Sequence, residues 1–153
     1  GRLFRIRTAK RRERFLFNFL CFLYFRRSGS HAFETRTVGM LAVAPYVFFS
    51  EVYFFKSQRW FVTLDQRIVG LVAFEEKTKA LFISVLASHP FYRRIGIASL
   101  VLDHAVRSAR KLGKASLELA VLRINKPALK LYIKFGFHLK NEKKRSYVLQ
   151  YQF

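Results

Sequence analysis

The residues with the clearest potential for chemistry lie at positions 86–98, where an apolar run meets a proline, two arginines and a glycine. The segment 81–86 has the composition of a strand, and the spacing of apolar residues over 97–112 predicts a helix. A strand that passes into a helix through a glycine leaves unpaired backbone N–H groups at the positive end of the helix. Because phosphate oxygens bind at such helix ends, the segment predicts an anion-binding turn.

Two segments match motifs of one enzyme family. The first, Arg93-Arg94-Ile95-Gly96-Ile97-Ala98, resembles the coenzyme loop Gln/Arg-x-x-Gly-x-Gly/Ala of the GCN5-related N-acetyltransferases (GNAT). The second, residues 125–137, resembles the family's Asn-x-x-Ala-x-x-Leu-Tyr-x-x-x-Gly-Phe segment. One helix and one strand separate the two matches, as in the family. The chain is therefore similar to a GNAT enzyme over residues 59–153 and more loosely over its first third.

This resemblance implies a fold of the α/β (α+β) class. The GNAT fold has a central mixed, mostly antiparallel seven-stranded sheet, flanked by about four helices and splayed between strands 4 and 5. The resemblance also implies acetyl-CoA as cosubstrate. The residues that it assigns to coenzyme binding are Leu86, Ala87, Ser88, Arg93, Arg94, Ile95, Gly96, Ile97, Ala98, Asn125 and Tyr132.

Individual roles follow from the same resemblance. Residues 86–88 would pair their backbone with the pantetheine arm and direct an N–H at the thioester carbonyl. Tyr132 would act as the catalytic acid, because a phenol with an ordinary pKa of about 10 can protonate a thiolate with a pKa of about 8 to 9. Tyr132 could instead pack one face of the last helix. Asn125 could contact the coenzyme, cap its helix, or do both.

The general base is the point where the sequence departs from the family. Enzymes that acetylate the N-termini of ribosomal proteins often carry a glutamate five residues before the asparagine, and here that position is Ala120. Glu118 lies two residues earlier, on the same side of an expected strand, and could act through water as a second catalytic residue. It could also be a solvated carboxylate at a strand end. Glu51, Glu75 and Glu76 are weaker candidates.

The missing strong base favours one class of acceptor. A lysine amine has a pKa of about 10.4 and a chain α-amine about 7.7 to 8, so deprotonating lysine costs roughly 3 to 4 kcal/mol more. We expect an acetyl-CoA-dependent N-acetyltransferase that transfers acetyl to a primary amine by direct attack on the thioester, with a protein or peptide amine favoured. The motif Arg-Arg-x-Gly-x-Ala is most similar to the corresponding motif of N-terminal (ribosomal-protein type) acetyltransferases. A small-molecule amine acetyltransferase and a non-catalytic ribosome- or nucleic-acid-binding module remain alternatives.

Composition limits the remaining properties. The 153 residues are 52% hydrophobic and predict one domain, residues 1–153. The net charge of +20, from 29 Lys+Arg and 9 Asp+Glu, predicts attraction to ribosomes or other polyanions. We expect a monomer or homodimer in the cytoplasm, since Cys21 is the single cysteine and no cleavage site follows the apolar segment 15–25. We expect no metal, because the four histidines lack the spacing of zinc ligands: His31, His89, His104 and His138.

The elements that must position these residues can be placed along the chain. Strands are expected at 3–8, 59–64, 68–75, 80–86, 115–122, 138–141 and 146–152. Asp65-Gln66-Arg67 predicts a hairpin turn. A helix at 13–27, apolar nearly all round, is expected to pack across the sheet, although a dimer face or a membrane-surface anchor is also possible. Its apolar core, 15–25, is too short to span a bilayer.

Three further helices complete the expected fold. Pro45 could open a helix through residue 55 that lines the acceptor side of the cleft with Tyr46, Phe49, Glu51 and Tyr53. The helix at 97–112 places its apolar residues on one face and ends at Gly113; these residues are Leu100, Val101, Ala105 and Leu112. The last helix begins after Asn125 and ends at Gly136.

Overall fold

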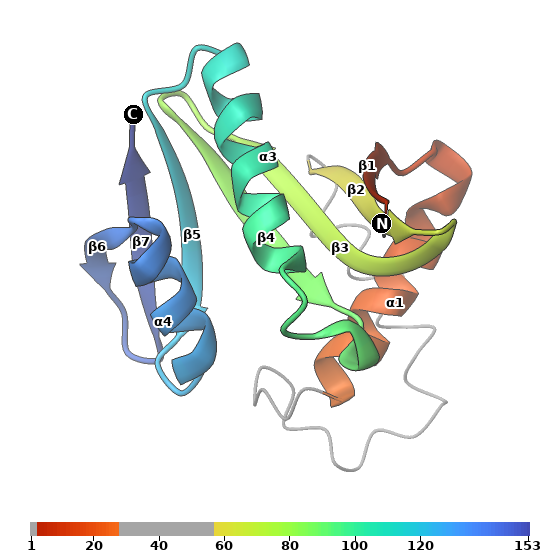
Figure 1. Cartoon of the computed structure of the whole chain (residues 1–153). Helices are drawn as coiled ribbons and strands as arrows, with labels where there is room; N and C mark the ends of the chain where they lie inside the picture. The colour runs from red at the N-terminus through yellow and green to blue at the C-terminus, as the bar shows by residue number, and fades with distance from the viewer. Residues whose placement is uncertain (1–2, 28–56) are drawn as a thin grey trace.

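The computed structural model describes residues 3–27 and 57–153, which form seven strands and three α-helices (Figure 1). The expected helix at 45–55, with Tyr46, Phe49, Glu51 and Tyr53, lies outside the described residues. The elements are β1 (Phe4–Thr8), α1 (Arg14–Arg27), β2 (Gln58–Leu64), β3 (Arg67–Glu76), β4 (Ala80–Ser88), α3 (Ile97–Lys111), β5 (Ser116–Leu122), α4 (Lys126–Phe135), β6 (His138–Glu142) and β7 (Ser146–Gln152).

The strands form one sheet in the order β1-β2-β3-β4-β5-β7-β6. All neighbours are antiparallel except β4 and β5, which are parallel and are joined through α3. The expected mixed, mostly antiparallel seven-stranded sheet is confirmed. Parallel neighbours need a crossover connection, and here α3 supplies it.

Two apolar clusters occupy the two faces of the sheet. The larger one joins residues of β2 to β5 and β7 with α3 and α4. The second packs α1 against β2, β3 and β4. Figure 1 shows this arrangement, with α3 in front of the sheet and α1 behind β3. The first four strands therefore carry a helix on each face.

Helix α1 packs through one side only. Phe17, Cys21 and Tyr24 are buried against the sheet, whereas Phe15 and Phe19 are exposed. The expected packing across the sheet is therefore confirmed for part of this apolar helix. Within the described part of the chain, no helix is long and apolar enough to cross a membrane.

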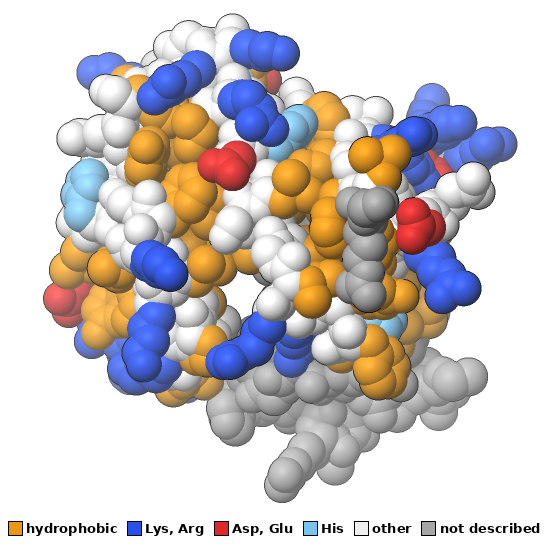
Figure 2. Space-filling view, viewed as in Figure 1, with side chains coloured by type: hydrophobic (Ala, Val, Ile, Leu, Met, Phe, Trp, Pro, Cys, Tyr) orange, Lys and Arg blue, Asp and Glu red, His pale blue; other side chains and the backbone are white. Residues whose placement is uncertain are grey.

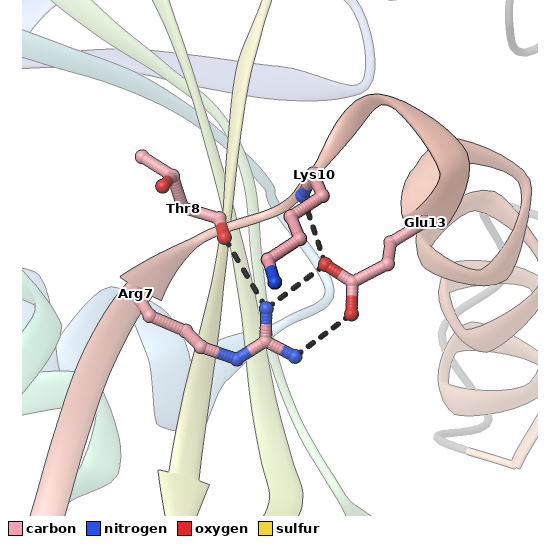
Figure 3. Close-up of polar contacts among 4 residues, drawn as sticks. All are labelled: Arg7, Thr8, Lys10 and Glu13. Atoms are coloured by element: carbon pink, nitrogen blue, oxygen red, sulfur yellow. Dashed lines mark hydrogen bonds and ion pairs between the residues drawn. The ribbon is translucent and has the colours of Figure 1, made fainter.

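A network of polar contacts fixes the connection between β1 and α1 (Figure 3). Both guanidinium NH groups of Arg7 donate to the Glu13 carboxylate, at 2.9 and 3.0 Å, and the Lys10 backbone N–H donates to the same carboxylate at 2.8 Å. These hydrogen bonds, chiefly that from Arg7, lower the pKa of Glu13 to about 2. The ionised carboxylate therefore fixes the direction in which the chain enters α1.

Local sequence explains most of the boundaries. Asp65 and Gln66 have φ of 48° and 70°, the left-handed pair that a two-residue hairpin requires. Gly113, with φ of 66°, follows the last turn of α3 as expected. The expected apolar face of α3 is confirmed for Val101 and Ala105, which are fully buried, but wrong for Leu112, which is 45% exposed. Leu112 is the C-cap residue, so its backbone has already left the helix.

Candidate active site

Strands β4 and β5 separate after a short parallel pairing. Only Ala80–Ile83 and Ser116–Leu119 are in register. The pairing ends where Ser84 forms a bulge, because Val85 and Ile83 pair with adjacent residues of β3. A bulge increases local twist and can terminate pairing. The expected splay between strands 4 and 5 is confirmed, and it leaves the backbone edges of 84–88 and 120–122 facing a gap.

A cleft of about 860 Å³ fills this gap, within the roughly 300–1,000 Å³ range of small-molecule sites. Figure 2 shows the opening between the side formed by β5 and the side formed by α3 and β4. The cleft is lined by the ends of β4 and β5 and the starts of α3 and α4. Nearly all the residues predicted to bind coenzyme line it: Leu86, Ala87, Ser88, Arg93, Arg94, Gly96, Ile97, Ala98, Asn125 and Tyr132.

The turn before α3 has the backbone of an anion site. Arg94 and Gly96 have φ of 60° and 90°, both left-handed, and successive turns of this kind can form anion-binding concavities. The Leu100 N–H bonds to the Gly96 carbonyl at 3.0 Å and is the first amide of α3 with a partner inside the helix. The preceding amides thus lie at the positive helix end. Arg93 and Arg94 are exposed beside them, whereas Ile95 does not line the cleft.

The position of this turn depends on a close approach between β3 and α3. A Cβ at Gly70 would lie 3.1 Å from Ile97 Cγ2 and 3.2 Å from Val62 Cβ. Ile97 is 2% exposed and packs in the larger apolar cluster, so its side chain anchors the helix start beside the cleft. The His89 N–H donates to the Val69 carbonyl at 2.8 Å, which ties the end of β4 to β3. Gly70 was not predicted as a positioning residue, because its importance depends on tertiary packing.

Tyr132 and Asn125 form the opposite wall. Tyr132 is 8% exposed, and burial raises the pKa of its phenol to about 12. The phenol is therefore protonated at neutral pH and can donate a hydrogen bond into the cleft. The Asn125 side chain accepts a hydrogen bond from the Ala128 N–H at 3.3 Å, so its expected role as N-cap of α4 is confirmed. Both residues line the cleft, Asn125 in addition to capping its helix.

The sequence matches a family model over most of its length. The model described as the acetyltransferase (GNAT) family matches residues 24–137. The chain belongs to the GNAT family. Among curated proteins, no significant match to this GNAT sequence is found.

Solved structures share the GNAT fold of this chain at low sequence identity. PH1933 from Pyrococcus horikoshii has a TM-score of 0.77 at 14% identity, with 99% of each chain covered. The PaiA N-acetyltransferase from Thermoplasma acidophilum, in complex with coenzyme A, has a TM-score of 0.74 at 14% identity and 99% coverage of each chain. A GNAT acetyltransferase from Elizabethkingia anophelis with acetyl-CoA bound has a TM-score of 0.69 at 12% identity and 98% coverage of each chain.

Glu118 is not among the residues that line the GNAT cleft. Its buried carboxylate forms an ion pair with Lys140 and accepts a hydrogen bond from Gln150 Nε2 at 3.0 Å. Gln150 lies directly opposite Glu118 on β7, so the strand pairing fixes this contact. The structure therefore does not support the expected catalytic role of Glu118. Glu75 and Glu76 are not in the cleft lining either, and Glu51 lies outside the described residues.

Tyr24 of α1 is a cleft residue that sequence reasoning missed. Its hydroxyl donates to the Ile68 carbonyl at 3.4 Å, and its ring lies edge-on to His89 with centroids 5.3 Å apart. Burial raises the pKa of Tyr24 to about 12. No local pattern places a tyrosine of α1 beside β4, because this contact joins residues more than 60 positions apart, so only an identified GNAT topology could have indicated it.

Metal ligands are not clustered in the part of the GNAT chain that the structure describes. There, no three His, Cys, Asp or Glu side chains lie close enough together to hold an ion. His104 packs between Trp60 and Phe74, and His89 caps the short turn after β4 by accepting from the Phe91 N–H at 3.2 Å. These two histidines have structural contacts.

Proposed function

We propose that this GNAT-family protein transfers the acetyl group of acetyl-CoA to a primary amine, with a peptide or protein α-amine as the favoured acceptor. The observation that carries the proposal is the cleft between the splayed strands, with an anion-binding turn on one wall and a buried phenol on the other. Solved structures that share the fold were determined with coenzyme A or acetyl-CoA bound, which agrees with this assignment.

Coenzyme binding would use mainly the backbone. The diphosphate would accept hydrogen bonds from the amides at the start of α3, with Arg93 and Arg94 beside it. Leu86, Ala87 and Ser88 present one strand edge to β3 and the other to the cleft. The cleft-facing edge can pair with the amide groups of a pantetheine arm as a further strand would.

The chemistry joins one amine nitrogen to the thioester carbonyl carbon and breaks the carbon–sulfur bond, and the nitrogen loses one proton, which passes to the departing sulfur or to water. A backbone N–H of β4 would stabilise the negative charge on the carbonyl oxygen. Tyr132 would donate its phenolic hydrogen to the departing sulfur. Its pKa of about 12 makes complete transfer to a thiolate of about 8.5 unfavourable by roughly 5 kcal/mol. We therefore assign Tyr132 a hydrogen bond that strengthens as the sulfur becomes negative.

The lining of the cleft favours an α-amine. Among the described residues that line it there is no Asp, Glu or His to act as a base. At pH 7 about a tenth of an α-amine is already neutral, against about one lysine amine in 2,500. An α-amine can therefore attack after losing its proton to water. This argument supports a GNAT enzyme of the N-terminal type.

Binding of the coenzyme is tested first. At a hundredfold excess over Kd, acetyl-CoA adds about 2.7 kcal/mol to stability. For a chain of this length, that gain should raise Tm by roughly 5–10 °C. If millimolar acetyl-CoA does not change Tm, the proposed coenzyme site is wrong.

The acceptor is tested by release of free thiol from acetyl-CoA with matched substrates. One peptide carries a free α-amine and an acetylated lysine, and its partner carries an acetylated N-terminus and a free lysine. We expect turnover with the first peptide only. Turnover with the second peptide, or only with a small amine such as spermidine, would contradict the α-amine assignment while leaving acetyl transfer intact.

A further inference from the structure

The C-terminal segment that forms α4, β6 and β7 is strongly basic. Residues 123–153 contain eight Lys and Arg and one acidic residue, Glu142, so they contribute 8 − 1 = +7 of the net charge of +20. The basic residues are Arg123, Lys126, Lys130, Lys134, Lys140, Lys143, Lys144 and Arg145. Lys140 is bound to the buried Glu118, Arg123 lies in the loop between β5 and α4, and the others lie on α4 and in the β6–β7 turn.

Helix α4 carries a row of lysines that its own stability does not require. Lys126, Lys130 and Lys134 are four residues apart and exposed, so they follow one face of the helix. Like charges at this spacing repel, and Lys126 also lies at the positive end of the helix. The opposite face, with Leu129 and Tyr132, packs into the core. The row is therefore a solvent-facing surface that the fold tolerates at some cost.

The β6–β7 turn extends this basic surface. Lys143, Lys144 and Arg145 are exposed, and Arg123 attaches the turn to the start of α4. The Arg123 N–H donates to the Arg145 carbonyl at 3.0 Å, and its guanidinium donates to the Lys143 carbonyl at 2.8 Å. Figure 2 shows Lys and Arg side chains gathered at the lower left, over α4 and this turn. The turn lies just before the start of β7 and beside the end of β5, at the end of the sheet where the cleft opens.

We propose that this basic surface, formed by Lys126, Lys130, Lys134, Lys143, Lys144 and Arg145, binds the phosphodiester backbone of duplex RNA. A row of exposed lysines on a helix beside a rigid basic turn provides several cations for neighbouring phosphates. We choose RNA over DNA because the proposed function acts on peptide α-amines, and these are exposed near ribosomes. This choice therefore rests on the proposed function. The surface itself does not depend on the acetyl-transfer chemistry.

Two other polyanionic partners fit less well. A helix that binds a bilayer surface buries its apolar face among the lipids, but the apolar face of α4 is already packed in the core. Single-stranded RNA is held by bases stacked on exposed aromatic rings. Tyr147, the second residue of β7, lies under the Arg123 guanidinium, with the ring centroid 4.5 Å from Arg123 Cζ. Backbone contact with a duplex therefore fits this surface best.

The test measures fluorescence anisotropy of a labelled 20-base-pair RNA duplex with the full chain, over a range of salt concentrations. Lys143→Glu with Lys144→Glu should weaken binding at least tenfold and reduce the slope of log Kd against log salt by about 2. The matched control is Lys77→Glu with Lys79→Glu, which changes the charge equally in the turn between β3 and β4 at the opposite end of the sheet. The control should weaken binding less than threefold.

Each outcome decides the proposal. Selective loss in the β6–β7 variant supports it, and tighter binding of the RNA duplex than of a DNA duplex of the same sequence supports the choice of RNA. Equal losses in both variants, no duplex binding, or binding to phosphatidylserine vesicles at salt concentrations that abolish RNA binding would overturn it. The acetyl-CoA-induced shift in Tm should be the same in both variants, so failure of RNA binding and failure of the coenzyme site give different results.

Discussion

The two walls of the cleft are built differently. The β4 wall belongs to the half of the sheet formed by β1 to β4, with α1 on one face and α3 on the other, and two apolar clusters stabilise it. The β5 wall has three strands, and in the described residues helices cover it on one face only, where α4 packs and α3 reaches β5. The uncovered face of the β5 wall carries a polar group of Glu118, Lys140 and Gln150. One wall is thus packed from both sides and the other from one side.

This difference corresponds to what each wall contributes. The β4 wall presents backbone groups, at residues 86–88 and in the turn before α3, and backbone groups must be held rigidly to be useful. The β5 wall presents a side chain, Tyr132, from a helix whose other face is charged. We therefore expect backbone changes to be most harmful on the first wall and loss of side-chain groups on the second.

The largest effect is expected from Gly96→Val on the β4 wall. Gly96 has φ of 90° and no neighbouring atom within 4 Å of the position that a Cβ would take, so valine would strain the turn and fill the space that we propose for the diphosphate. We expect a loss of acetyl-CoA affinity of about a hundredfold, or roughly 2.7 kcal/mol, measured by titration calorimetry. Gly113→Val is the control, since Gly113 has φ of 66°, equally open surroundings and a position at the far end of α3. Equal losses of affinity in both variants would show that the turn at Gly96 has no specific role in binding acetyl-CoA.

The next effect is expected from Tyr132→Phe on the β5 wall. Removing the hydroxyl should lower kcat at least tenfold, or about 1.4 kcal/mol, while Kd for acetyl-CoA changes less than about twofold, because the ring and its packing remain. Tyr147→Phe, on the same wall but outside the cleft, should leave both unchanged. Steady-state turnover at the wild-type rate would exclude the phenol from the reaction.

A smaller effect is expected from Glu118→Gln, which changes stability. The variant leaves Lys140 without its carboxylate partner. Since Lys140 is 45% exposed, we expect a loss of only about 1 kcal/mol and a fall in Tm of roughly 2–4 °C. Glu142→Gln, which breaks the more exposed pair with Arg123, should cost less. If Glu118→Gln instead lowers kcat tenfold and removes the acidic limb of the pH–rate profile, Glu118 is the base after all.

The smallest effect concerns His104, which packs beside β2 and β3. Burial, followed by the charges of Arg107 and Lys111, lowers the pKa of His104 below its ordinary 6.5. The unfolded chain therefore binds a proton more readily than the folded one, and stability falls as pH drops from about 6.5 towards the folded pKa. Urea titrations at pH 7 and 5.5 should show a lower free energy of unfolding at pH 5.5 in the wild type, and a smaller difference between the two pH values in His104→Phe. An equal difference in both proteins would mean that another group causes the dependence of stability on pH.

Features set by neighbouring residues could be predicted from the sequence. The turn at Asp65 and Gln66, the Asn125 cap and the stop at Gly113 each depend on the conformations that a few consecutive residues permit. The two family motifs added the order of the elements and a part of the cleft lining. Each motif is a continuous stretch of the chain, one forming the turn before α3 and the other containing α4, so the position of each could be predicted from the sequence.

Features set by distant pairing could not be predicted. Glu118 was expected near the reacting centre, since a period of two places it on the same side of β5 as Ala120, but its partners on β6 and β7 bind it away from the cleft. Tyr24 enters the cleft because α1 crosses β4, and Gly70 matters because α3 rests on β3. These three residues depend on contacts between elements, which a periodic pattern does not specify.

The short parallel ladder between β4 and β5 also determines how the coenzyme-free protein can come apart. Four residue pairs are the only strand pairing between the two halves of the sheet in the part of the chain that the structure describes, and they lie at the end away from the opening. A coenzyme held across the open end would add hydrogen bonds between the halves that the coenzyme-free protein lacks. The availability of acetyl-CoA in the cell would then set the lifetime of the protein against proteolysis as well as its rate of turnover.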